Sequence, residues 1–110
     1  MEQADLAPSL AVLADLIRGR HTLVLSGAGI STESGIPDYR SPRSAARRGK
    51  PLYYQEFARD PAVRARYWAR SAVGWPRVTA ARPNAGHAAL AGMEEAGAIL
   101  GIITQNVDFV

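Results

Sequence analysis

Two short, wholly apolar segments stand out from the amphipathic pattern of the rest of the chain. Leu23-Val24-Leu25 lies in a strand predicted over residues 22–26, and a second strand is predicted over 99–103. Apolar runs of this length without alternation are typical of strands buried on both faces of a sheet. Because helical segments separate the two runs, the handedness rule for crossovers predicts that the strands pair in parallel.

Apolar residues at helical spacing predict the connecting and flanking helices. One helix is predicted from about Leu6 to Arg18, with Asp5 as its cap and Gly19 as its stop. A short helix is predicted over 52–58, and a longer one from Asp60-Pro61 to about Val73. The last helix opens at Pro83-Asn84 and ends at Gly97. Three aromatic residues are expected to pack the longer helix onto the rest of the chain, namely Tyr67, Trp68 and Trp75.

The order strand, helical crossover, strand is half of a mononucleotide-binding unit. The fold class expected is therefore α/β, with a partial Rossmann-like parallel sheet. A chain of 110 residues is one small domain or a piece of a larger one, and residues 1–110 are treated as one unit.

A glycine corner, Gly27-Ala28-Gly29, follows the first predicted strand directly. Its nearly bare backbone lets N–H groups approach a phosphate, and Ile30 to Ser34 can form a short helix whose positive end points to the same place. Taken alone, this pattern is equally consistent with a tight turn that joins a strand to a helix. The position of the third glycine in the usual dinucleotide fingerprint holds Thr32.

Polar residues follow both predicted strands at the same edge of the sheet. Gly35 to Arg40 places a carboxylate, an aromatic ring and a guanidinium beside the glycine corner. An amide–acid segment, Gln105-Asn106-Val107-Asp108, follows the second strand. Since ligands bind at the carboxyl ends of parallel strands, the glycine corner and the amide–acid segment are expected to face one crevice.

These residues carry a family resemblance. GAGIST, SGIPDYRS and TQNVD resemble the start of the catalytic domain of sirtuins, the Sir2-like NAD-dependent protein deacylases. The segments RYWAR, VGWP and RPN are similar to the class II branch of that family. The resemblance runs from about Ala11 to Asp108. It implies that residues 1–110 are the N-terminal portion of a Rossmann-like NAD-binding catalytic domain, truncated and without the zinc-binding small domain.

The resemblance also implies that the cofactor is NAD, and it indicates which residues of this chain bind it. Backbone amides near the glycine corner suit the pyrophosphate, Gln105 the ribose, and Asn106 with Asp108 the nicotinamide carboxamide. Asp38, Tyr39 and Arg40 are placed to close over the reacting end of the cofactor. The full set of cofactor-binding residues expected is Gly27, Ala28, Gly29, Ser31, Thr32, Ile36, Pro37, Asp38, Tyr39, Arg40, Gln105, Asn106, Val107 and Asp108.

The activity implied by the resemblance is transfer of an acyl group from an acyl-lysine protein substrate to the ribose of NAD. The family's catalytic histidine and the two Cys pairs that bind zinc have no counterpart here, and neither His21 nor His87 replaces the base. No catalytic residue and no metal ligand is therefore assigned. The chain is expected to be an incomplete domain, inactive alone. The alternatives are a non-catalytic NAD or ADP-ribose-binding module and a basic nucleic-acid module.

The amino-acid composition of the chain limits the classes of molecule that it is expected to bind. The net charge is +3, with twelve Arg and one Lys, and there is no cysteine, which excludes disulfides. A basic cluster within residues 41–51 (Arg43, Arg47, Arg48 and Lys50) lacks interleaved aromatic residues, so a solvated loop is favoured over a nucleic-acid patch. In sirtuins this region holds a flexible cofactor-binding loop. No apolar run approaches membrane-spanning length, so a cytoplasmic protein is expected. An exposed sheet edge favours self-association.

Overall fold

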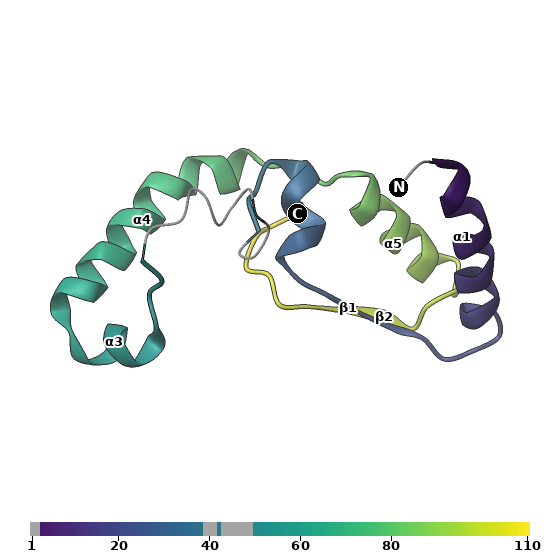
Figure 1. Cartoon of the computed structure of the whole chain (residues 1–110), viewed down its shortest axis with the longest axis horizontal. Helices are drawn as coiled ribbons and strands as arrows, with labels where there is room; N and C mark the ends of the chain where they lie inside the picture. Colours follow the sequence, from purple (N-terminus) through teal and green to yellow (C-terminus); the bar gives the residue numbers. More distant parts are fainter. Residues whose placement is uncertain (1–2, 39–41, 43–49) are drawn as a thin grey trace.

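The computed structural model describes residues 3–38, 42 and 50–110 of the chain, and its elements alternate as predicted (Figure 1). They are α1 (Gln3–Ile17), β1 (Leu23–Ser26), the 3₁₀ helix η1 (Ala28–Ser34), α3 (Tyr54–Arg59), α4 (Pro61–Ala80), α5 (Ala85–Glu95) and β2 (Gly101–Thr104).

The sheet joins β1 and β2 in parallel, which confirms the predicted pairing. Leu23 lies opposite Gly101 and Ser26 lies opposite Thr104, so the two strands end level with each other. One hydrogen bond continues the ladder at each end, from Leu100 N–H to Thr22 O at 2.8 Å and from Gln105 N–H to Ser26 O at 3.1 Å. The segments that follow the two strands therefore start side by side.

The expectation that both faces of the strands are buried is wrong for the described part of the chain. Leu23 and Leu25 are 61% and 68% exposed, and Ile103, which lies opposite Leu25, is 56% exposed. Side chains alternate across a strand, so these three residues share one face. On the other face α5 packs against β2. An apolar run shows what a strand has to bury, but it does not show which element covers it.

Helix α1 confirms the first predicted helix but not its cap. The chain leaves α1 through Gly19, whose φ of +69° is the left-handed conformation predicted for the stop. At the other end α1 begins at Gln3, three residues before the predicted start at Leu6, so position 5 lies within the first turn and not ahead of the helix.

Helix α4 is longer than predicted. Asp60 caps it as expected, with Ala62 N–H donating to Asp60 Oδ1 at 2.9 Å, but the helix continues past Val73 to Ala80. Pro76 removes the donor that would reach the carbonyl of Ala72, a position that is exposed, so water can solvate that carbonyl. Helix α4 therefore includes both Gly74 and Pro76, which follow the predicted end at Val73.

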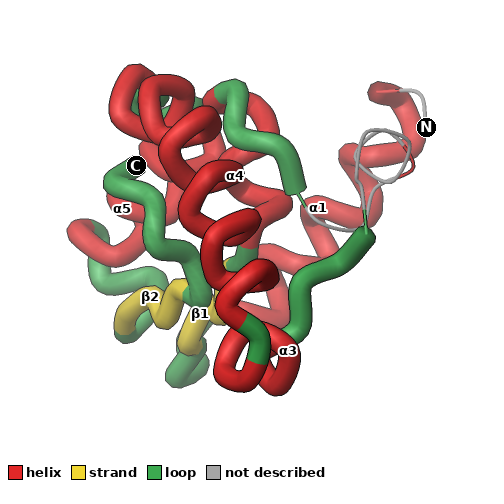
Figure 2. Tube along the Cα trace, turned by 90° about the vertical axis from the view of Figure 1, so that its left-hand side faces the viewer, coloured by secondary structure: helices red, strands yellow, loops and turns green. Residues whose placement is uncertain are grey.

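Helix α3 folds back against the start of α4, as Figure 2 shows from the α3 end of the molecule. Val63 is buried between them at 7% exposure. Arg64 Nη1 donates to the carbonyls of Phe57 and Ala58 at 3.0 and 3.3 Å, so this guanidinium neutralises the end of α3. The predicted packing of the aromatic residues is only partial. Tyr67 meets Phe57 and Trp75 meets Phe109 edge-on, but the exposures of Tyr67, Trp68 and Trp75 are 43%, 62% and 53%.

The molecule is elongated, with α1 and α3 at opposite ends of the long axis (Figure 1). Its extents are 51 × 30 × 27 Å and its radius of gyration is 17.8 Å. A compact domain of this length has a radius of about 13 Å. The accessible surface is 8815 Å², whereas a compact monomer of this mass exposes about 5,900 Å². The described residues therefore form one partly covered layer of an α/β fold.

Among the described residues, none of the helices is both long and apolar enough to span a lipid bilayer. The cytoplasmic location stays a prediction.

Candidate functional site

The glycine corner and the amide–acid segment meet at the carboxyl ends of β1 and β2. Gly27 follows β1 directly, and Gln105 follows β2. Asn106 reaches across between them, since its Nδ2 donates to the carbonyl of Gly27 at 3.1 Å. The backbone N–H of Asn106 donates to Thr104 Oγ1 at 3.0 Å, which fixes the turn that carries this amide. The convergence of the two segments that topology predicts is thus made by direct hydrogen bonds.

Ser31 is the centre of this meeting point. Its side chain is 0% exposed, and its Oγ donates to Asp108 Oδ2 at 2.8 Å. The same oxygen accepts a hydrogen bond from Asn106 Nδ2 at 3.3 Å. A buried hydroxyl requires partners, and both come from the segment that follows β2. We refer to Gly27, Ser31, Asn106 and Asp108 as the corner cluster.

The backbone of the glycine corner forms the first turn of η1. Ile30 N–H donates to Gly27 O at 3.2 Å, and Thr32 Oγ1 donates to Gly29 O at 3.0 Å. Gly35 ends η1 with a φ of +87°, a conformation that favours glycine. Gly29 differs, because its φ is not positive and a Cβ added there meets no atom within 4 Å. Neither the backbone nor the described surroundings require a glycine at position 29.

Asn84, the N-cap of α5, is hydrogen-bonded to η1. Its Nδ2 donates to Ile30 O at 2.7 Å and to Ser34 Oγ at 3.0 Å. The sequence predicts Asn84 as a helix opening, but it does not show which groups the amide nitrogen of the cap contacts. His87 Nδ1 accepts from Asn84 N–H at 3.1 Å and completes the cap of α5.

The remaining predicted site residues are not members of the corner cluster. Thr32, Pro37 and Gln105 are exposed, and Ala28, Ile36 and Asp38 are half-buried. Val107 is 90% exposed, so its side chain does not take part in the corner cluster. Tyr39 and Arg40 lie outside the described residues, as does the basic cluster except Lys50.

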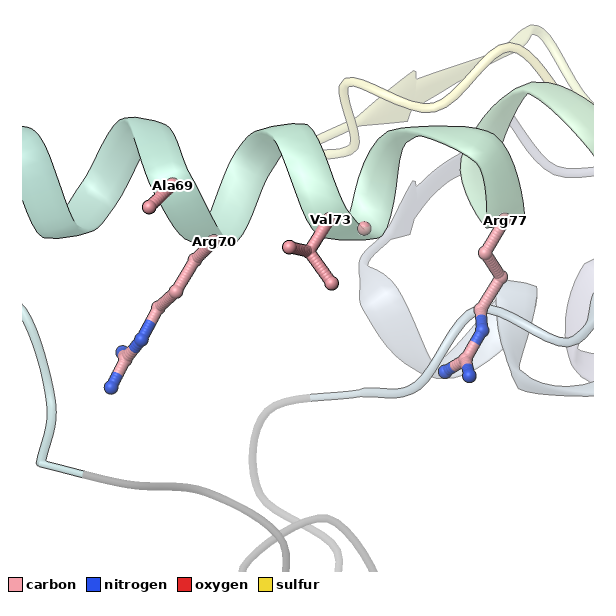
Figure 3. A pocket seen from close by; sticks show the side chains of 5 residues that line it. Ala69, Arg70, Val73 and Arg77 are labelled. Carbon is pink, nitrogen blue, oxygen red and sulfur yellow. The ribbon is translucent and has the colours of Figure 1, made fainter.

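A separate cavity of about 440 Å³ lies along α4, away from the corner cluster. The described residues that line it all come from one face of α4, and Figure 3 shows Arg70, Val73 and Arg77 projecting to the same side. Arg70 is engaged by the backbone, since its Nη1 donates to Lys50 O at 3.3 Å. None of the lining residues belongs to the predicted site. Within residues 3–38, 42 and 50–110, no group of three or more His, Asp or Glu side chains is arranged to hold a metal ion.

Comparison with known proteins gives the family. The model of the Sir2 family matches residues 27–110, a range that begins at the glycine corner and includes the amide–acid segment. The chain belongs to the Sir2 family. NAD-dependent protein deacetylase 1 of Streptomyces coelicolor is 54% identical over 108 residues, which are 96% of this sirtuin chain and 36% of the relative. NAD-dependent protein deacylase SRT2 of Arabidopsis thaliana is 59% identical over 86 residues, 77% of this chain and 23% of the relative.

Solved sirtuin structures share the fold. A mutant Sir2 homologue in complex with ADP ribose superposes with a TM-score of 0.71 at 35% identity, covering 98% of this chain and 41% of the other. The predicted α/β class, a partial Rossmann-like domain of the sirtuin type, is therefore confirmed. The chain spans about a third of the length of the curated relatives it matches.

Proposed function

We propose that this chain supplies the NAD-binding N-terminal part of a sirtuin-type NAD-dependent protein deacetylase or deacylase, a transferase that acts on acyl-lysine proteins. Membership of the Sir2 family and the names of relatives at 50–59% identity support this proposal. The observation that carries it is the corner cluster, in which Ser31, Asn106 and Asp108 join the ends of two parallel strands. This is the place where α/β sheets bind nucleotides.

The residues around the corner cluster fit a dinucleotide. Gly29 leaves open space beside the backbone, which suits close approach by a phosphate, and the first N–H groups of a helix have no partner inside it. Gln105, Asn106 and Asp108 follow β2 and offer amide and carboxylate groups for ribose and carboxamide. Bound NAD would supply an electrophilic ribose carbon, to which an acyl oxygen would bond as nicotinamide leaves.

The contribution of Asp108 is orientation of the nicotinamide end. Because Ser31 Oγ holds Asp108 Oδ2, the carboxylate has a fixed direction, and Asn106 is fixed in the same way by Gly27. Preorganised polar groups of this kind position a ligand without the cost of ordering flexible side chains when the ligand arrives.

The 110-residue chain alone is proposed to bind without turnover. Transfer of the acyl group needs a general base, and the catalytic histidine of the family has no counterpart among the described residues of the corner cluster. The imidazole of His87 is engaged in the cap of α5. Binding without turnover would make the isolated chain a NAD or ADP-ribose module, which is the alternative function that the same residues support.

Calorimetry with NAD and ADP-ribose, together with a deacetylation assay on an acetyl-lysine peptide, tests this proposal. We expect saturable binding of both nucleotides and no NAD-dependent product. The Asp108→Asn variant separates the two functions, because its amide oxygen still accepts from Ser31 Oγ while the carboxylate is lost, so a nicotinamide-orienting carboxylate predicts weaker NAD binding with unchanged ADP-ribose binding. Equal effects on both ligands favour a plain ADP-ribose module. Absence of binding by the folded chain contradicts both, and robust turnover contradicts the proposed incompleteness.

The acyl-lysine substrate and self-association are further parts of the proposal. The face formed by Leu23, Leu25 and Ile103 is apolar and more than half exposed, and within the described residues each strand has one unpaired edge. Such surfaces favour pairing with another copy of the chain. A nucleic-acid partner is not proposed, because binding nucleic acid would give the residues of the corner cluster no role.

A further inference from the structure

The side chain of Asn84 connects the start of α5 to η1 at two residues, Ile30 and Ser34. Its Oδ1 accepts from Gly86 N–H at 2.8 Å and from His87 N–H at 3.3 Å, which caps α5. Its Nδ2 donates to Ile30 O and Ser34 Oγ at 2.7 and 3.0 Å. The side chain is only partly exposed, and all of its polar atoms are used. The oxygen of this amide therefore caps α5, and its nitrogen is hydrogen-bonded to η1.

The cap itself does not need the Nδ2 group. Ser, Thr and Asp cap helices about as well as Asn, because only a side-chain oxygen is required. The second half of the cap is made by His87, whose Nδ1 accepts from Asn84 N–H at 3.1 Å. An amide at position 84 thus provides two donors beyond what α5 requires, and they reach residues 54 and 50 positions earlier in the chain.

One of these hydrogen bonds reaches Ile30, the residue before Ser31, and the other reaches Ser34, three residues after it. Ile30 O is drawn toward α5, while the next residue, Ser31, is bonded to Asn106 and Asp108 on the β2 side. The backbone of η1 is consequently fixed from two directions at adjacent residues. A Cβ added at Gly86 would lie 3.1 Å from Asn84 Oδ1 and 3.7 Å from Ile30 Cγ1, so the start of α5 approaches η1 closely.

We propose that Asn84 is a positioning residue for the nucleotide site. It fixes the orientation of η1, and with it the amides of the glycine corner and the hydroxyl of Ser31. The inference rests on the proposed function for the identity of the ligand, an ADP-ribose group. The effect of Asn84 on η1 does not depend on the proposed function. Asn84 acts through η1, to which its amide nitrogen is hydrogen-bonded.

The test compares Asn84→Ser with His87→Gln in the full chain. Serine keeps the helix cap and adds no charge, but its side chain is too short to donate to Ile30 O. Glutamine at position 87 keeps an acceptor for Asn84 N–H and leaves Nδ2 in place. Amide hydrogen exchange of residues 28–36 reports on η1, and exchange of residues 85–95 reports on α5. Calorimetry with ADP-ribose reports on the site.

In Asn84→Ser we expect about tenfold faster exchange over 28–36, unchanged exchange over 85–95, and about tenfold weaker ADP-ribose binding, while His87→Gln matches the wild type. Unchanged exchange over 28–36 overturns the inference. So does faster exchange over both segments, which would show a role in folding alone. If the wild-type chain does not bind ADP-ribose, the proposed function fails, and hydrogen exchange still decides whether Asn84 positions η1. If it binds and Asn84→Ser binds equally well, the inference fails and the proposed function stands.

Discussion

Ser31 shows how one buried hydroxyl specifies the arrangement of two distant segments. At 0% exposure it has no access to water, so its hydrogen bonds to Asp108 and from Asn106 are the ones that satisfy it. Leaving a buried polar group without a partner costs more than the bond itself contributes. The contact therefore selects one register between the end of β2 and η1.

A double-mutant cycle with Ser31→Ala and Asp108→Ala measures this contact. We expect each single change to lower the free energy of unfolding, with a coupling energy of about 1–2 kcal/mol, because the bond joins a hydroxyl to a carboxylate. Urea unfolding followed by circular dichroism gives the values. Asp108→Asn is the matched control, since its amide oxygen still accepts from Ser31 and most of the stability should remain. Strict additivity of the two alanine changes would show that the contact contributes nothing.

At this scale the sequence predicted the partners but not the way in which they are joined. The convergence of Gly27 with Asn106 and Asp108 followed from parallel topology, which places strand ends together whatever the side chains are. The second role of Asn84 could not be predicted, because it depends on how α5 sits against η1. The assignment of individual residues to NAD stays a prediction, and Tyr39 and Arg40 lie outside the described part of the chain.

Helix α4 shows the limit of local signals at the scale of elements. Gly and Pro mark turns in most sequences, yet Gly74 and Pro76 lie inside a helix that ends only at Ala80. The starts of α4 and α5 were predicted correctly because Asp60 and Asn84 make specific caps. The end of a helix depends more than its start on what the following residues contact. The start of a strand was also misplaced, since β2 begins at Gly101, two residues later than predicted.

The same substitution at two glycines should have opposite effects. Gly74→Ala is expected to stabilise the chain by about 0.5–1 kcal/mol, because the site is helical and a Cβ added there meets no atom within 4 Å. Gly97→Ala is expected to destabilise it by about 1 kcal/mol, because Gly97 has a φ of +74° after α5. Urea midpoints of the two variants provide the comparison. A loss of stability in Gly74→Ala would mean that α4 is not helical at this point.

The whole molecule exposes more apolar surface than a compact domain does. Leu10 and Leu13 of α1 are 58% and 50% exposed, and the face with Leu23, Leu25 and Ile103 lacks a covering layer in the described residues. The predicted strands, helices and parallel pairing are present, while the predicted burial on both faces is absent. Burial is a property of the complete assembly of layers, so a local apolar run cannot report it.

Self-association through the uncovered sheet face is testable by sedimentation equilibrium. We expect the wild-type chain to exceed the mass of one copy at tens of micromolar, and Leu25→Lys to shift it toward the single-copy mass. Lysine on this face opposes pairing through charge and through the loss of apolar contact. Ala72→Lys, at an exposed position of α4, is the control and should not alter the distribution. A wild-type chain that is monomeric throughout this range contradicts the predicted association.

The most direct test of the account is a titration of the ¹⁵N-labelled chain with ADP-ribose, followed by amide chemical shifts. We predict that resonances of Gly27 to Thr32 and of Gln105 to Asp108 shift together, with one common dissociation constant, because the two segments border one site. Shifts confined to a single segment, or to α4, would contradict the claim that the ends of β1 and β2 form the nucleotide site.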